Sequence, residues 1–238
     1  MTALLLVAHG SRDPRAAAST RALVRAVAAA RPGVDLAAAY LDHTAPAVPA
    51  ALRDLVARGH TEAVAVPLLL TEAYHGRVDL PAVLAEVRAG GLPIDVRQAR
   101  ALGGPAVVGA LRRRLAEISR GYDGLVLAAA GTRDESARET VAATAQALSD
   151  AVGVPCRPAY ASAAAPTPGQ AVAAMRSAGA RRVVVSAYFL APGLLYERAL
   201  SSAMAAGAIG ATAPLGAAPE LVELIVARAV APGMVIAR

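Results

Sequence analysis

Residues 4–14 read LLLVAHGSRDP, a short apolar run that ends abruptly in a histidine, a glycine and a group of polar residues. An apolar run of this length, bounded by turn residues, predicts a strand buried on both faces of a parallel sheet. Ligand sites in open parallel sheets form just beyond the carboxyl ends of the strands. That place is taken here by the residues that follow the run, His9, Gly10, Ser11 and Arg12.

A second apolar run in the first half also ends beside a histidine. Residues 64–70, VAVPLLL, lead directly into TEAYHGRVD, which carries His75. Because the carboxyl ends of parallel strands share one edge of a sheet, we expect the imidazoles of His9 and His75 to lie close together. Neutral imidazole is the commonest protein ligand of divalent transition metals, and it takes up protons near neutral pH. This pair is the centre of the predicted site, with a capping or packing role as the plain alternative for each histidine.

A further strand, predicted over residues 34–41, ends at Asp42 and His43. Neighbouring residues of a strand face opposite ways, so only one of these two side chains need point toward the site. Two imidazoles and a carboxylate at adjacent strand ends would hold Fe²⁺, Co²⁺ or Ni²⁺ with open positions left for a substrate. Ser11 is expected to cap a helix or to donate a hydrogen bond to a ligand. His60 lies in a predicted loop, where we expect an exposed turn residue.

Strands and helices alternate along the first half of the chain. Apolar periodicity and turn residues predict strands over 4–8, 34–41, 63–70 and 94–99, and helices over 15–30, 46–58 and 79–88. Asp13 and Pro14 are placed as the N-cap and the first-turn proline of the first helix. Strands separated by helices indicate right-handed crossovers, so the sequence predicts an α/β fold with a parallel sheet flanked by helices.

The second half of the chain repeats the first. Residues 125–135, LVLAAAGTRDE, repeat LLLVAHGSRDP; residues 156–166 repeat the second strand and its turn, and residues 182–200 repeat the third strand and its loop. A period of half the chain is far too long for a solenoid. We therefore predict two duplicated α/β domains, residues 1–118 and 119–238, with a ligand cleft between them.

The two copies differ in their histidines, all of which lie in the first copy. Ala130 stands at the position of His9, and Ser162-Ala163 replaces Asp42-His43. His75 falls on Leu194 or Leu195, depending on where a gap is placed. This asymmetry indicates that one copy carries the chemistry and the other forms a wall of the site.

The composition limits the partners. The 238-residue chain has a formal net charge of +6, its arginines are scattered rather than clustered, and only 3% of its residues are aromatic. A nucleic-acid surface would show a basic stripe or stacking aromatic residues, so we expect no nucleic-acid partner. Guanidinium groups suit a small ligand rich in carboxylates or phosphates. No stretch predicts a transmembrane helix or a signal peptide, and a single cysteine fits a reducing compartment, so a cytoplasmic location without membrane attachment is expected.

Several catalytic classes lack their motifs. The chain has no G-x-S-x-G elbow of a serine hydrolase, no G-x-x-x-x-G-K-[ST] or G-x-G-x-x-G phosphate motif, and no C-x-x-C pair. A nucleotide requirement is therefore unsupported. Cys156 lies in the copy without histidines, where inert burial is the expected role.

The segments VAHGSRDP, AAAYLDHTAP and PLLLTEAYHGRVDLP together resemble the sirohydrochlorin chelatases, the ATP-independent cobalto- and ferrochelatases, over the whole chain. The resemblance implies insertion of Fe²⁺ or Co²⁺ into sirohydrochlorin, in sirohaem or cobalamin biosynthesis. It also implies that His9 and His75 form the metal-binding and proton-accepting pair. Asp42 stands where relatives often carry glutamate, whereas His43 is unexpected at its position and is a candidate additional metal ligand.

The substrate of that family carries many carboxylates at its periphery. The resemblance therefore gives a role to the arginines near the predicted strand ends, Arg12, Arg77, Arg133 and Arg198, and to Ser11. The divalent metal is a substrate, and no permanently bound cofactor is expected. Two other functional hypotheses stay open. One is a bilobal carrier of an anionic tetrapyrrole or metal without turnover, and the other is a phosphate-transfer enzyme with His9 as nucleophile. The sequence fits a monomer or a homodimer.

Overall fold

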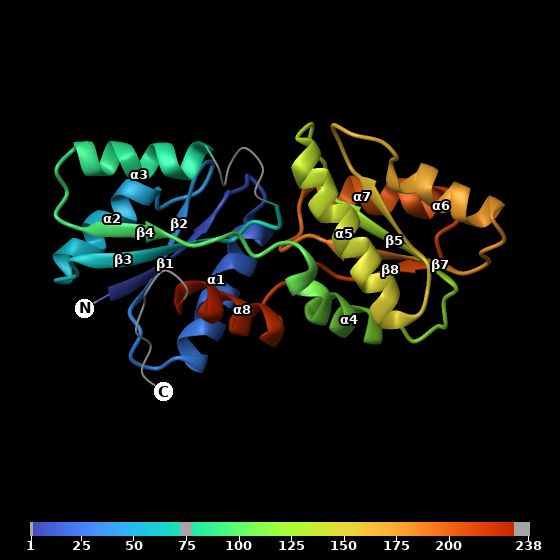
Figure 1. Ribbon diagram of the computed structural model, residues 1–238, viewed down its shortest axis with the longest axis horizontal. Coiled ribbons are helices and arrows are strands. Elements are labelled where there is room, and N and C mark those ends of the chain that lie inside the picture. Colours follow the sequence, from blue (N-terminus) through green and yellow to red (C-terminus); the bar gives the residue numbers. More distant parts are fainter. Residues whose placement is uncertain (1, 72–77, 231–238) are drawn as a thin grey trace. The chain divides into compact units, whose positions relative to one another are not determined.

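The computed structural model describes residues 2–71 and 78–230, which form two compact units that are each a parallel sheet covered by helices (Figure 1). In the first unit the strands are paired in the order β2-β1-β3-β4, and all pairs are parallel. Its strands are β1 (Thr2–Ala8), β2 (Leu36–Tyr40), β3 (Glu62–Pro67) and β4 (Asp95–Gln98), and its helices are α1 (Pro14–Ala30), α2 (Val48–Ala57) and α3 (Leu80–Ala89).

The strand β1 lies inside the first sheet because its side chains are apolar on both faces. Residues 3–8 are all buried, and Leu5 and Val7 belong to the core cluster that includes Leu52 of α2 and Leu80 of α3. The opposite face of the sheet is covered by α1 and by the last helix, α8 (Pro219–Val230) (Figure 1). An unbroken apolar run is what two helical layers require of a central strand.

The first helix begins where the sequence predicts. Asp13 is the N-cap of α1, its carboxylate accepts a hydrogen bond of 2.9 Å from the backbone N–H of Arg15, and Pro14 is the first helical residue. Proline suits that position because its missing N–H would have no intrahelical partner. This cap fixes the direction in which the chain leaves the end of β1.

The second unit has the same topology, with strand order β6-β5-β7-β8, which confirms the predicted duplicated α/β fold. Its core is packed between one face of the sheet and the helices α6 (Pro168–Ser177) and α7 (Leu194–Ala205). The opposite face is covered by α4 (Val108–Ala116) and α5 (Glu135–Val152). Its strands are β5 (Gly124–Ala129), β6 (Cys156–Tyr160), β7 (Val183–Tyr188) and β8 (Gly210–Ala211), and its helices are η2 (Pro105–Val107), α4 (Val108–Ala116), α5 (Glu135–Val152), α6 (Pro168–Ser177) and α7 (Leu194–Ala205).

The closing helices of the two copies are exchanged, which differs from the predicted boundary between residues 118 and 119. The first unit comprises the chain through Leu102 together with α8, and the second runs from Gly103 to Ala218. The helix α4 packs on α5 and β7, and α8 packs on α1 and β3. Both helices are amphipathic, and an apolar helix face does not specify which of two similar sheets it covers.

Among the helices of residues 2–71 and 78–230, none combines the length and the apolar character needed to cross a membrane.

Candidate functional site at the ends of β1 and β2

The loops after β1 and β2 lie in direct contact at the carboxyl end of the first sheet. The backbone N–H of Asp42 donates a hydrogen bond of 2.8 Å to the carbonyl of His9. Gly10 has a φ of 94°, and a Cβ atom built on it would lie 1.7 Å from the carbonyl oxygen of Asp42. Only glycine allows this approach, because any side chain would force the two loops apart. The glycine of the HGSR segment thus brings His9 beside Asp42.

Asp42 and His43 belong to a turn rather than to a strand. The strand β2 ends at Tyr40, and His43 has a φ of 57°, in the left-handed region. The carboxylate of Asp42 accepts a hydrogen bond of 2.7 Å from the backbone N–H of His43, and its other oxygen lies 3.2 Å from His43 Nε2. The alternation expected for a longer strand therefore does not apply here, and the two side chains contact each other.

This turn places its imidazole near that of His9. The ring centroids of His9 and His43 are 6.3 Å apart and the planes are inclined by 76°. The side chains of His43 and Asp42 are 36% and 58% exposed, so an incoming ligand can reach both. Two imidazoles and one carboxylate are thereby gathered at the ends of β1 and β2.

The predicted partner His75 and the predicted substrate ligand Arg77 lie outside the described residues. Within residues 2–71 and 78–230, no group of three or more histidine, cysteine, aspartate or glutamate side chains is arranged to hold a metal ion. The cluster of His9, Asp42 and His43 therefore supplies only part of the ligand set that the sequence predicts.

Ser11 and Thr44 tie the two loops together. The backbone N–H of Ser11 donates to Thr44 Oγ1 at 3.2 Å, and this hydroxyl donates to the Ser11 carbonyl at 3.1 Å. Ser11 Oγ accepts from the backbone N–H of Asp13 at 3.0 Å, so Ser11 shapes the turn before α1 and does not cap the helix itself. The sequence analysis did not single out Thr44. Its counterpart in the second copy is Ala164, so this polar side chain, like the histidines, is present only in the first copy.

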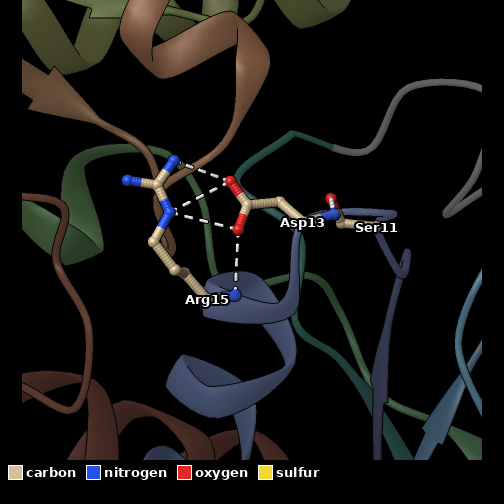
Figure 2. A network of polar contacts seen from close by, with 3 residues as sticks. All are labelled: Ser11, Asp13 and Arg15. Carbon is tan, nitrogen blue, oxygen red and sulfur yellow. Dashed lines mark hydrogen bonds and ion pairs between the residues drawn. The ribbon is translucent and has the colours of Figure 1, made fainter.

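The start of α1 carries an ion pair that limits what the polar loop can offer a ligand. Figure 2 shows the guanidinium of Arg15 directed at the carboxylate of Asp13, with Nη2 at 2.7 Å and Nε at 3.1 Å from its oxygens. The side-chain hydrogen bond from Arg15 holds the pKa of Asp13 below its ordinary value, and the backbone N–H of Arg15 acts in the same direction. The charges of Asp13 and Arg15 are thus paired with each other, and the side chain of the preceding residue, Arg12, is exposed.

The corresponding loop of the second copy has the same construction. Thr132 Oγ1 accepts from the backbone N–H of Asp134 at 3.1 Å, and Asp134 caps α5 through the backbone N–H of Ala137 at 3.1 Å. Arg133 is exposed at the position that matches Arg12. Each copy thus presents one exposed arginine immediately before the helix that follows its first strand.

Two other residues singled out in the sequence lie away from these loops. The prediction for His60 is wrong: its side chain is 8% exposed, and Nε2 lies 2.6 Å from the carboxylate of Asp35, which also pairs with Arg58. A charged partner at the opposite end of the sheet, which no local pattern revealed, accounts for this burial. Cys156 lies in β6, and burial raises the pKa of its thiol to about 12, which makes it a poor nucleophile.

Comparison with known proteins places both halves of the chain in one family. The model of the family described as CbiX matches residues 3–118 and again residues 124–231. A sirohydrochlorin cobaltochelatase from Methanococcoides burtonii is 30% identical over 95 residues, which are 39% of this chain and 72% of that protein.

Solved structures share the fold of the whole chain. SirB from Bacillus subtilis with Fe³⁺ superposes with a TM-score of 0.82 at 23% identity, over 95% of this chain and 93% of that one. The sirohydrochlorin chelatase SirB from Bacillus subtilis subspecies spizizenii in complex with cobalt gives a TM-score of 0.80 at 22% identity, over 96% and 93% of the two chains.

Proposed function

This chain belongs to the CbiX family, and from that premise we propose that it is a sirohydrochlorin chelatase, which inserts Fe²⁺ or Co²⁺ into the tetrapyrrole without a nucleotide. The curated relative that shares 30% identity is a sirohydrochlorin cobaltochelatase. The observation that carries the proposal is the convergence of His9, Asp42 and His43 at the carboxyl ends of β1 and β2 in the only copy that has histidines.

The reaction makes two demands that these residue types meet. A divalent metal replaces two pyrrole protons, so the site has to deliver the metal and to take up two protons. Imidazole near neutral pH does both, because the same nitrogen either coordinates a metal or accepts a proton. We assign these roles to His9 and His75, with the carboxylate of Asp42 as the anionic ligand of the metal. His43, in contact with Asp42, is proposed as an additional ligand that influences metal preference.

The tetrapyrrole is recognised through its acidic periphery. We assign its carboxylates to guanidinium groups, which bind carboxylates in a two-pronged fork. The proposed contacts are Arg12 and Ser11 before α1, Arg77, and Arg133 before α5. Exposure of the Arg12 and Arg133 side chains supports their part in this assignment. The proposal includes a cytoplasmic location and no nucleic-acid partner; Ni²⁺ is a further candidate metal.

An anaerobic absorbance time course tests the proposal. Sirohydrochlorin is mixed with Co²⁺ or Fe²⁺, with and without the protein, and the shift to the metallated spectrum is followed. We expect the protein to accelerate the shift, and the metal that reacts faster identifies the preferred substrate. A rate equal to the uncatalysed rate with both metals and with Ni²⁺ would refute the enzyme; binding without acceleration would instead indicate a carrier.

A double variant separates catalysis from binding. His9→Ala with His75→Ala removes both imidazoles and leaves the arginines in place. We expect this variant to bind sirohydrochlorin as the parent does and to lose metal insertion. If insertion continues at the parent rate, the roles assigned to the two histidines are wrong.

A further inference from the structure

The strand β2 lies at one edge of the first sheet and pairs there only with β1. The carbonyl of Asp35 accepts a hydrogen bond of 2.9 Å from a backbone N–H of β1, and the N–H of Leu41 donates one of 3.0 Å to a carbonyl of β1. Alternate residues of a strand direct their N–H and C=O groups to opposite sides, so those of Leu36 and Ala38 point away from β1. Within residues 2–71 and 78–230, no backbone group bonds to them. These donors and acceptors are therefore available to another strand.

A groove of about 530 Å³ runs beside this edge, between β2 and α2. Residues 36–38 form one side, and the side of α2 that carries Ala50, Asp54 and Arg58 forms the other. Asp54 and Arg58 form an ion pair of 3.1 Å, and their side chains are 66% and 36% exposed. The groove thus combines small apolar side chains with one accessible charge of each sign.

The matching edge of the second unit is protected against the addition of a strand. The edge strand there is β6, and its register with the central strand matches Arg157 to Ala37 and Pro158 to Ala38. Pro158 has no N–H at the position that points outward, and Arg157 is exposed. Proline and charged residues on edge strands prevent edge-to-edge pairing. The strand β2, LAAAY, contains neither, so only the first unit leaves this edge open.

We propose that β2 pairs with β2 of a second copy of this chain, antiparallel, about a two-fold axis beside Ala37. In this register Leu36 of each copy lies opposite Ala38 of the other, and their outward N–H and C=O groups bond to each other. Ala37 faces its own counterpart in a closely spaced pair, where two methyl groups fit and two charged side chains would repel each other. The inference does not depend on the proposed function.

The charges beside the edge favour a second copy over a foreign strand. A two-fold axis brings α2 of one copy beside α2 of the other, so Asp54 of each copy can pair with Arg58 of its partner. A strongly acidic or strongly basic partner would instead meet one charge of its own sign. The groove is therefore complementary to itself in charge as well as in backbone hydrogen bonding.

The pairing ends before the candidate functional site. The N–H of Tyr40 already donates to the carbonyl of Pro46 at 2.9 Å, so it is not available to a second strand. The ladder between the copies is thus limited to residues 36–38, and the loop that follows β2 stays accessible to a ligand.

A cysteine placed at the axis tests the register. In the proposed pairing the two Cα atoms of residue 37 lie about 4.5 Å apart, a distance that a disulfide spans. Residue 38 of one copy lies diagonally from residue 38 of the other, at about 7–8 Å, which is too far. Under mild oxidation we expect Ala37→Cys to give a covalent dimer on a non-reducing gel, and the matched control Ala38→Cys to give none. The parent, whose single cysteine is Cys156, sets the background. Equal cross-linking of the two variants would refute the register.

Sedimentation velocity of the full chain over a range of micromolar concentrations tests the assembly itself. We expect the parent to be in equilibrium between monomer and dimer. Ala38→Pro introduces the residue of β6 and removes the hydrogen bond that each copy donates at this position, so it should raise the Kd of the dimer about 10- to 100-fold. Arg157→Ala changes the other edge strand, leaves β2 as it is, and should keep the parent Kd.

Two outcomes overturn the proposal. One is a parent that stays monomeric at every concentration, even if its edge binds an extended peptide. The other is a dimer that Ala38→Pro does not weaken, which would place the interface elsewhere. Thermal unfolding of each variant checks the fold, and the proline at the matching position of β6 shows that this strand geometry accepts the substitution.

Discussion

At the carboxyl ends of the two sheets the backbone conformation is the same, whereas the side chains differ. Gly10 and Gly131 have φ angles of 94° and 99°, and His43 and Ala163 have φ angles of 57° and 59°. A Cβ atom at Gly131 would lie 1.9 Å from the carbonyl oxygen of Ser162, much as one at Gly10 would meet the carbonyl of Asp42. The left-handed residue and the close approach are therefore features of the shared fold and do not depend on histidine.

The residues at one position of this turn, Asp42 in the first copy and Ser162 in the second, show the chemical consequence of the difference in side chains. Ser162 Oγ donates a hydrogen bond of 2.8 Å to the carbonyl of Ala130, so its polar group is used within the loop. Asp42 has no proton to donate to the matching carbonyl, and its carboxylate accepts from the backbone N–H of His43 instead. The serine hydroxyl is bound to the backbone of the adjacent loop, whereas the aspartate leaves a negatively charged carboxylate exposed to solvent. The second copy retains the scaffold, and the first adds two imidazoles and an exposed carboxylate at this end of the sheet.

The largest expected effect, on the rate of metal insertion, comes from replacing His9 by the residue found at its counterpart in the second copy. His9→Ala introduces the residue that the second copy carries at Ala130, so the backbone should tolerate it. We expect the rate of Co²⁺ insertion to fall by about 10²- to 10⁴-fold, the range for losing a positioned proton acceptor. Initial rates measured anaerobically with sirohydrochlorin in excess check this. A folded variant with the parent rate would show that His9 is only a packing residue.

The next effect tests whether the shared backbone is purely structural. Gly10→Ala and Gly131→Ala each force a Cβ atom into a carbonyl oxygen at a left-handed position, and each should cost about 2–3 kcal/mol of unfolding free energy. Urea unfolding of both variants measures this. Only Gly10→Ala should also weaken Co²⁺ binding, because only its loop carries His9 and Asp42. Equal weakening by Gly131→Ala would mean that the second loop takes part in binding the metal.

The fold and the meeting of the loops after β1 and β2 followed from sequence because both depend on local patterns. Apolar runs marked the central strands, and Asp13-Pro14 marked the start of α1, as the structure confirms. Parallel topology alone then brought the ends of the first two strands together. The extent of β2 was less predictable: the second strand was expected over residues 34–41, but the chain already turns after Tyr40. The alternation argument for Asp42 and His43 failed for that reason.

Contacts between segments that are far apart in the chain could not be predicted from the sequence. The exchange of α4 and α8 depends on which sheet each helix covers, and an apolar helix face does not specify that sheet. The burial of His60 depends on Asp35, a residue 25 positions earlier. Thr44 was detectable in principle, because comparison of the two copies shows alanine at its counterpart. A polar residue present in only one copy is therefore a better guide to the site than residue type alone.

A smaller effect is expected from exchanging the residue that distinguishes the two turns. Asp42→Ser gives the first copy the side chain of Ser162, which can bond to the adjacent carbonyl and so preserve the loop. We expect Co²⁺ to bind about tenfold more weakly, because the exposed carboxylate is gone. A titration with Co²⁺ measures this, and Ser162→Ala in the second copy serves as control with unchanged affinity. An unchanged affinity in Asp42→Ser would exclude the carboxylate from the metal site.

The smallest effect concerns the opposite, amino-terminal edge of the sheets, where the copies also differ. Asp35 pairs with His60 and Arg58 in the first copy, whereas Pro155 and Ala180 occupy the places of Asp35 and His60 in the second. Burial by itself raises the pKa of Asp35, but the hydrogen bond from His60 and the charge of Arg58 outweigh it, so the pKa lies below the ordinary 3.8.

A lowered folded-state pKa fixes the sign of the pH dependence. The stabilisation by the Asp35 carboxylate is fully present above pH 3.8 and is lost as the pH falls through the lower pKa of the folded state. Asp35→Asn should therefore reduce the unfolding free energy by about 1 kcal/mol at pH 7, and the difference from the parent should shrink as the solution is acidified below pH 4. Urea unfolding at a series of pH values measures this. A difference that stays constant down to the lowest pH would show that the carboxylate stabilises the first unit through packing and not through its charge.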